Sequence, residues 1–244
     1  MDLPDFAALA PEARRAFEAA DRLLARPDPG RLRRVRAWLR GDPSSAIRVD
    51  AEALRHPLSA HYASRDVTRP PSRRSPREIS LLRDLTGGRG RFDPDLGFAD
   101  MLHRIAGAVR REETAALRTR SCRSQPDGGG QYVVFPPPRQ AAVLVQALDG
   151  FARRQAGASP MFVATVLMNG ICNAHPFPDG NGRVSRIVFN AQVNQAAGGF
   201  GYLPLYELSM MSSGGFIIRL RAAQYHGDWS GLADYVHQAA MLFA

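Results

Sequence analysis

The chain has 244 residues, of which 45% are apolar, 23% are charged and 8% are aromatic. This composition is typical of an ordinary globular protein and excludes a fibrous or disordered one. No apolar run reaches the roughly 18 residues that a membrane span needs, and the N-terminus has neither the basic lead nor the apolar stretch of a signal peptide. We therefore expect neither an integral membrane protein nor one secreted through a signal peptide.

The positive charge of the chain comes entirely from arginine. There are 32 basic and 23 acidic residues, which gives a net charge of +9, and no lysine is present. A GC-rich genome explains this usage, because arginine codons are GC-rich; phosphate or nucleic-acid binding is the functional alternative. Cys122 and Cys172 are too few for a disulfide framework or a zinc site, so they indicate reduced thiols in a cytoplasmic protein.

The first 62 residues are predicted to form an N-terminal helical region. Residues 12–26 carry an apolar face at helical spacing with charges opposite, and the turn at 27–30 ends this helix. A second, short basic helix is predicted over 31–40. A third is predicted over about 46–55, with Ser44 and Ser45 as candidate caps.

Residues 63–97 are predicted to form an exposed connection. Arginine, proline and serine crowd together over 69–77, and Gly87 and Gly88 interrupt the chain further on. Such a composition can bury little, so we expect a solvated linker with a short helix near 77–85. A basic docking strip is the alternative.

Residues 98–244 are predicted to form a helical core interrupted by one hairpin. A helix over about 98–111 is followed by a turn signal at 126–130, a β-prone run over 131–135 and the step Pro136–Pro138, which together indicate a short projecting β-hairpin. Ser159 and Pro160 begin a helix over 160–173 that is apolar almost all round and is expected to be buried. Further helices are predicted around 143–151, from about 184 to 198, over 208–226 and over 230–242.

The chemistry is concentrated directly after the buried helix, in His175-Pro-Phe-Pro-Asp-Gly-Asn-Gly-Arg-Val-Ser-Arg186. Gly180 and Gly182 flank Asn181 at a predicted helix start. Free backbone N–H groups and the positive end of the helix dipole favour an anion at such a place. The pattern therefore predicts a phosphate site.

The charged residues of the segment strengthen this interpretation. Arg183 and Arg186 are three residues apart, so they face the same side of the helix and can hold more than one phosphate oxygen. Asp179 can hold a divalent ion that bridges phosphates, and His175 can accept a proton near neutral pH. Each feature alone is explained by a loop, a tight turn or a solvated helix face; their joint occurrence favours a polyphosphate site with a general base.

This segment resembles the signature of the Fic family, H-P-F-x-[D/E]-G-N-G-R-x-x-R, at every defined position. The resemblance extends from about Ser44 to the C-terminus, because Phe135–Pro138 is similar to the proline step that follows the family's flap, and Gly227–Trp229 is also similar. It implies an all-α Fic fold, a helical bundle with a short β-hairpin flap. It also implies an enzyme that uses ATP and Mg²⁺ to transfer AMP to a Ser, Thr or Tyr hydroxyl of a target protein, or to itself.

The resemblance assigns roles to individual residues. His175 deprotonates the target hydroxyl, Asp179 binds Mg²⁺, and the phosphates are held by Gly180, Asn181, Gly182, Arg183 and Arg186. The flap is expected to pair with the target segment by strand addition; its residues are Gln131, Tyr132, Val133 and Val134. Doc-like relatives that transfer phosphate carry lysine at the position of Gly182, so adenylylation is favoured over phosphorylation.

One departure concerns regulation. Many Fic proteins silence themselves with a helix carrying [S/T]-x-x-x-E-[G/N], whose glutamate pairs with the second motif arginine, here Arg186. The stretch similar to the N-terminal form of this motif is Ser44–Arg48, in which Arg48 replaces the glutamate. Because two guanidinium groups repel each other, we expect an enzyme without Glu-based autoinhibition. The alternatives are that Asp50 or Glu52 substitutes, or that Arg48 contacts a phosphate.

A second departure concerns the nucleotide. Relatives often carry an Asn-Arg pair and aromatic residues at the position of residues 210–216, where this chain reads Met-Met-Ser-Ser-Gly-Gly-Phe. The base is therefore open, and UTP, GTP or another phospho-group donor is an alternative to ATP. A non-catalytic nucleic-acid-binding regulator is the alternative from another class, but the intact motif argues against it. Action in its own cytoplasm and delivery into a host cell both fit the sequence.

Overall fold

The fold is given by a computed structural model that describes residues 2–26, 28–45, 47–61, 74–93, 95–124, 130, 132–197 and 201–243. These residues contain short 3₁₀ segments and eleven α-helices. The α-helices are α1 (Pro11–Leu24), α2 (Arg31–Leu39), α3 (Ala51–Leu54), α4 (Arg74–Leu85), α5 (Phe98–Arg110), α6 (Ala141–Arg154), α7 (Pro160–Ala174), α8 (Asn181–Ala196), α9 (Leu205–Met211), α10 (Gly215–His226) and α11 (Ser230–Phe243).

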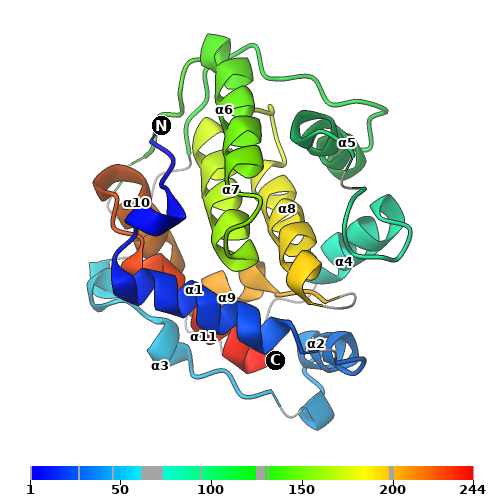
Figure 1. Ribbon diagram of the computed structural model, residues 1–244, viewed down its shortest axis with the longest axis vertical. Coiled ribbons are helices and arrows are strands. Elements are labelled where there is room, and N and C mark those ends of the chain that lie inside the picture. The colour runs from blue at the N-terminus through cyan, green and yellow to red at the C-terminus, as the bar shows by residue number, and fades with distance from the viewer. Residues whose placement is uncertain are drawn as a thin grey trace.

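Helix α7 forms the centre of the fold, as its apolar sequence predicts. The Ser159 hydroxyl accepts a hydrogen bond from the Phe162 N–H at 3.1 Å, and Pro160 occupies the first turn. Nearly every side chain of α7 is buried. Helix α8 packs along α7 (Figure 1). Helices α6 and α1 also pack against α7, and α11 packs against α1. No helix in the described ranges is long and apolar enough to cross a membrane.

Helix α4 differs most from expectation. It begins at Arg74, earlier than predicted, and it lies beside α5 and α8 rather than in an exposed linker (Figure 1). Ile79 and Leu82, three residues apart, are both buried on one face of α4. Ser75 and Glu78 are also buried, and both have partners in the site described below. The division of the chain at residues 62 and 97 stays a prediction.

Two other helices differ in extent from the prediction. The third predicted helix is only α3, because the Asp50 side chain accepts a hydrogen bond from the Glu52 N–H at 2.9 Å and so caps a helix that begins at Ala51. The single helix expected over 208–226 is divided into α9 and α10. Ser213 (φ 49°) and Gly214 (φ 89°) take left-handed backbone conformations, which a right-handed helix cannot continue.

The predicted hairpin is reduced to a single antiparallel bridge, between Arg123 and Val134. The Ser124 N–H donates to the Val133 carbonyl at 2.8 Å, and the Phe135 N–H donates to the Cys122 carbonyl at 3.2 Å. We keep the name flap for these two arms, residues 122–124 and 132–135. Their described residues form no strand. Pairing ends where the prolines begin, because proline has no N–H to donate.

Candidate functional site

The loop between α7 and α8 begins and ends with a residue in the left-handed backbone conformation. His175 ends α7 with φ 44° and ψ 55°, and its N–H donates to the Ile171 carbonyl at 3.0 Å. Gly180 precedes α8 with φ 86°, and a Cβ atom there would lie 2.8 Å from Cγ1 of Val109 in α5. Only glycine fits both this backbone and this close approach.

Asn181 closes the loop on itself. Its side chain accepts a hydrogen bond from the Phe177 N–H at 2.9 Å and donates one to the Phe177 carbonyl at 2.7 Å. Both residues are buried, and Phe177 packs edge-on against His103 with ring centroids 5.7 Å apart. The Asn181 side chain therefore fixes the loop, so an anion here would meet the backbone at the start of α8.

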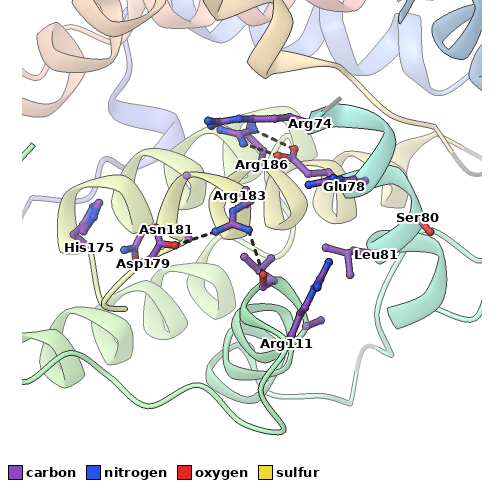
Figure 2. A pocket seen from close by; sticks show the side chains of 15 residues that line it. Arg74, Glu78, Ser80, Leu81, Arg111, His175, Asp179, Asn181, Arg183 and Arg186 are labelled. Carbon is purple, nitrogen blue, oxygen red and sulfur yellow. Dashed lines mark hydrogen bonds and ion pairs between the residues drawn. The ribbon is translucent and has the colours of Figure 1, made fainter. Parts of the chain in front are cut away.

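A polar cavity of about 730 Å³ opens between this loop, α4 and the end of α5 (Figure 2). Residues of the motif that line it are His175, Asp179, Gly180, Asn181, Gly182, Arg183 and Arg186. Helix α4 adds Arg74, Arg77 and Glu78, and Arg111 follows α5. Several guanidinium groups thus surround one space, which concentrates positive potential where a polyphosphate would bind.

Arg183 lies at the open side of the polar cavity. Its Nη1 donates to the Val109 carbonyl and its Nη2 lies near Oδ2 of Asp179, both at 3.2 Å (Figure 2). The Asp179 side chain is 80% exposed. An ion pair this exposed contributes at most about 1 kcal/mol, so a ligand can displace it at little cost.

Asp179 is also the candidate Mg²⁺ ligand. Among the described residues, no three His, Cys, Asp or Glu side chains gather into a protein metal site. Mg²⁺ is typically held by one or two carboxylates, with water and substrate phosphate oxygens supplying the other ligands. An exposed carboxylate at the rim of an arginine-lined cavity fits this donor set.

Arg186 lies deeper and forms a two-point ion pair with Glu78 of α4 (Figure 2). Its Nη2 donates to Oε1 at 2.5 Å and its Nε donates to Oε2 at 3.1 Å. The Tyr202 hydroxyl donates a further hydrogen bond to Oε2 at 2.5 Å. Burial alone would lower the pKa of Arg186, but the charge and hydrogen bonds of Glu78 outweigh it and raise that pKa. Arg186 is thus locked as a cation against one buried carboxylate.

Helix α4 is anchored to α9 one turn before Glu78. The Ser75 hydroxyl and N–H both donate to the carboxylate of Glu207, the N–H at 3.3 Å. Glu207 is fully buried, and burial raises its pKa. The guanidinium groups of Arg74 and Arg186 lie 4.4 and 5.2 Å from the ring centroid of Tyr206. These contacts hold Glu78 in place against Arg186.

Because Arg48 replaces the motif glutamate, the sequence predicts an enzyme without Glu-based autoinhibition, but in the structure Arg186 does have a glutamate partner. Ser44 and Arg48 are exposed and line neither of the cavities described here; Nη1 of Arg48 donates to the Ile47 carbonyl at 3.5 Å. The partner comes instead from α4. In the inhibitory motif [S/T]-x-x-x-E-[G/N], the glutamate follows the serine or threonine by four residues and is itself followed by glycine or asparagine. In α4, Glu78 follows Ser75 by three residues and is followed by Ile79.

His175 lies where the polar cavity meets a second, mostly apolar cavity of about 340 Å³. Burial lowers the pKa of His175, and the positive charge of Arg118 acts in the same direction. The hydrogen bond between Nδ1 and the Cys172 carbonyl, at 3.4 Å, and the charge of Asp179 oppose this shift without cancelling it. With Nδ1 donating to that carbonyl, Nε2 carries the lone pair of a neutral imidazole.

None of the residues that line the apolar cavity belongs to α4. His175, Gly182 and Arg186 line both cavities. Helices α7, α9 and α10 and the flap supply the other walls, including Phe135, Met168, Leu205, Tyr206 and Phe216. A flat, largely apolar group suits such a space.

The flap residues point in two directions. Val133 and Phe135 line the apolar cavity, whereas the side chains of Tyr132 and Val134 are exposed. This alternation is that of an extended chain. Gln131, the fourth predicted flap residue, lies outside the described residues.

Sequence reasoning missed the residues that α4 and Arg111 add to the polar cavity, and among the partners of the motif it missed Glu78, Tyr202 and Arg118. Glu78 is the lone acid between Arg74 and Arg83 in a segment rich in arginine, and this was its only signal. Tyr202 and Arg118 carry no local pattern, because Glu78 lies 124 residues from Tyr202 and His175 lies 57 residues from Arg118.

Residues 96–193 match the model of the Fic/DOC family. The match includes the flap and the whole loop between α7 and α8, so these residues are similar to a Fic/DOC domain. No curated protein sequence matches the chain.

Solved structures with a similar fold cover nearly the whole chain. A Fic family protein from Desulfovibrio desulfuricans G20 aligns with a TM-score of 0.63 at 17% identity, over 98% of this chain and 74% of that one. Fic-1 (aa134–508) from C. elegans aligns with a TM-score of 0.56 at 17% identity, over 95% of this chain and 69% of that one. IbpAFic2, in a structure where it is covalently tethered to Cdc42, aligns with a TM-score of 0.52 at 14% identity, over 94% of this chain and 70% of that one. These likenesses show the Fic helical fold.

Proposed function

We propose that this chain, through its Fic/DOC-like domain, is a protein adenylyltransferase that transfers AMP from ATP to a Ser, Thr or Tyr hydroxyl of a target protein. The observation that carries the proposal is the meeting of two unlike cavities at His175, Gly182 and Arg186. One cavity is lined by arginines and the other by apolar side chains. A nucleoside triphosphate has the same two halves, so binding across both cavities would bring its α-phosphate to His175.

The transfer would take place in line at that phosphate. Nε2 of His175 takes the proton of the target hydroxyl, the hydroxyl oxygen forms a bond to the α-phosphorus, and the bond to the bridging oxygen of pyrophosphate breaks. Arg183, Arg186 and the N–H groups at the start of α8 hold the leaving pyrophosphate. Asp179 would hold Mg²⁺, which supplies charge neutralisation to the phosphates when bound.

Gly182 supports transfer of AMP rather than of phosphate. A Cβ atom at this position would lie 3.4 Å from Nη1 of Arg186, at the boundary between the two cavities. A lysine here, as in Doc-like kinases, would extend a second cation into that boundary. Glycine leaves the passage open for the phosphate chain.

The target is proposed to be a protein that docks on the flap. Tyr132 and Val134 present exposed side chains beside residues that line the apolar cavity, and the flap backbone can accept another extended segment. The structure of IbpAFic2 tethered to Cdc42 provides an example of a fold of this kind engaged with a protein.

Glu78 is proposed to restrain the enzyme at rest. It occupies the two donor positions of Arg186 that a phosphate would use, and it is itself buried and hydrogen-bonded by Tyr202. Binding of a triphosphate in the productive orientation therefore requires this ion pair to open. This proposal replaces the expectation of an enzyme without Glu-based autoinhibition.

Incubation with Mg²⁺ and either α-labelled or γ-labelled ATP tests the proposed chemistry. The protein would be used alone and with a lysate, as wild type, Glu78→Gln and His175→Ala. We expect label to be transferred to protein from α-labelled ATP only, and Glu78→Gln to transfer more label than wild type. His175→Ala should transfer at least a hundredfold less, because it lacks the general base. Parallel reactions with labelled UTP, GTP and CTP test the base.

The outcomes separate the alternatives. Transfer of γ label would assign phosphotransfer instead, and efficient transfer from a different nucleotide would change the donor. The absence of label from all four nucleotides, with Glu78→Gln as well as wild type, would overturn the proposal.

A further inference from the structure

Arg118 joins three separate segments of the chain at the base of the flap. It is only 4% exposed. Its Nε donates to the His175 carbonyl at 2.6 Å, Nη1 donates to the Arg120 carbonyl at 3.1 Å, and Nη2 donates to the Pro136 carbonyl. The backbone of Arg118 adds a fourth link, since its N–H donates to the Pro176 carbonyl at 2.8 Å. One buried cation thus ties the flap to the loop that carries the general base.

The flap also touches the imidazole directly. The ring of Phe135 stacks on the ring of His175, with centroids 3.8 Å apart and planes 15° from parallel. Phe135 is held by its N–H, which donates to the Cys122 carbonyl at 3.2 Å, and by the next residue, Pro136, whose carbonyl Arg118 binds. Arg118 therefore holds the backbone of His175 directly and that of Phe135 through the next residue, Pro136.

The backbone of His175 needs such support. Its left-handed conformation is unfavourable for a residue with a Cβ atom and persists only where the surroundings impose it. The guanidinium of Arg118 is well suited to impose it, because its planar fork holds several carbonyls at once and stays charged when buried.

We propose that Arg118 and Phe135 are positioning residues that orient the imidazole of His175 and couple it to the flap. Arg118 sets the backbone of the base and Phe135 sets its ring plane. A target segment that seats on the flap then meets a base already aimed at its hydroxyl. This inference rests on the proposed adenylyl transfer for its kinetic consequence, but the orientation of the ring can be measured without it.

Arg31 provides a matched control. It is also 4% exposed, and its guanidinium also donates to three carbonyls, those of Leu23, Leu24 and Arg26, at and just after the end of α1. Arg31→Gln and Arg118→Gln therefore remove the same kind of buried contact. We expect Arg118→Gln to lower kcat by roughly tenfold to a hundredfold, with the KM for ATP changed less than about twofold, because misplacing a reacting group affects the chemical step. Arg31→Gln should leave kcat within about twofold.

The NMR signal of the His175 ring gives the second measurement. A proton over the face of an aromatic ring is shifted upfield, so wild type should show one displaced histidine Cε1–H signal, assigned by its loss in His175→Ala. Phe135→Leu should return this signal to the normal range and lower kcat by about tenfold, whereas Phe135→Tyr should preserve both. Arg118→Gln should move the signal although Phe135 is intact.

Three results would overturn the proposal. One is a wild-type His175 signal at a normal position. Another is an Arg118→Gln protein whose His175 signal and kcat match those of Arg31→Gln. If Arg118→Gln does not fold, the comparison of Phe135→Leu with Phe135→Tyr decides, and equal kcat and equal shifts in that pair would overturn it. If wild type transfers no nucleotide at all, the proposed function fails, and the NMR comparison still shows whether Arg118 orients the ring.

Discussion

Arg183 and Arg186 are one turn apart on α8 and face the same cavity, yet their partners differ in almost every respect. Arg183 pairs with Asp179 at 3.2 Å, and the two side chains are 38% and 80% exposed. Arg186 pairs with Glu78 at 2.5 Å, and these side chains are 14% and 1% exposed. The same residue type in one motif thus forms one labile ion pair and one buried one.

The difference shows how a single helix turn can serve both binding and restraint. An incoming phosphate can replace Asp179 at Arg183 with little loss, because water already competes for that pair. At Arg186 it must displace a carboxylate that also accepts a hydrogen bond from Tyr202 and that belongs to a helix anchored at Ser75. The burial of the partner, rather than the arginine itself, decides which position is available.

The largest expected effect is on folding stability. Glu78→Ala should lower the free energy of unfolding by about 2–4 kcal/mol, because it leaves Arg186 and the buried Tyr202 hydroxyl without their acceptor. Asp179→Ala should cost less than about 1 kcal/mol. Urea denaturation of both variants measures the difference, and equal losses would remove the distinction between the two pairs.

The next effect is on activity. Glu78→Gln should raise the rate of AMP transfer by at least tenfold, since a neutral amide no longer competes with phosphate for Arg186. Glu52→Gln is the matched control, because Glu52 forms an exposed pair with Arg55 at 2.6 Å away from the polar cavity. A rise of the same size in both variants, or in neither, would show that Glu78 does not restrain the enzyme.

A smaller effect is expected in the pH profile. The pKa of His175 is lowered by burial, so the neutral base should persist below its ordinary pKa of about 6.5. The acid limb of kcat/KM should therefore lie below pH 6.5, with activity falling as pH drops through the lowered value. The same shift makes the unfolded chain bind more protons than the folded one, so stability should also fall as pH drops below about 6.5. An acid limb at or above pH 6.5 would contradict the burial of the base.

The smallest effect concerns the anchor of α4. Ser75→Ala removes the hydroxyl that donates to Glu207 but leaves the backbone donor in place. The start of α4 should loosen slightly, and transfer should rise by about two- to threefold with a small loss of thermal stability. Asp84→Asn, at an exposed position of the same helix that lines neither cavity, is the control and should change neither.

Local sequence was sufficient for α7 and for the loop that carries the motif, although it misplaced α3 and α4 and joined α9 to α10. The apolar pattern of α7, its Ser159–Pro160 start and the glycines around Asn181 are all short-range signals, and each is found where it was expected. The Fic signature also lies within twelve contiguous residues, His175–Arg186. Pattern reasoning succeeds there because the chemistry and the turn lie within one stretch.

It failed where the partners are far apart. Glu78 and Arg186 are separated by 108 residues and Glu78 and Tyr202 by 124, so nothing near Glu78 indicates that it will be buried. The arginines and prolines before it suggested a linker, but Ile79 and Leu82 give α4 a face that packs on α5 and α8. The resemblance of Ser44–Arg48 to the inhibitory motif was misleading, because Ser44 and Arg48 are exposed and line neither cavity, although Ser45 and Ile47 are buried.

Cys172 lines the apolar cavity beside His175, and its thiol donates to the Ser185 hydroxyl at 3.3 Å. Burial raises the pKa of this thiol, so alkylating reagents should react with it slowly and faster at alkaline pH. Cys122, the other free thiol, lies in the flap and does not line that cavity. The rate of Cys172 alkylation should therefore report whether the apolar cavity is occupied. A nucleoside bound there should protect Cys172 from alkylation, while Cys122 continues to react. Mass spectrometry of the two peptides would then rank donor nucleotides by direct binding, independently of any transfer.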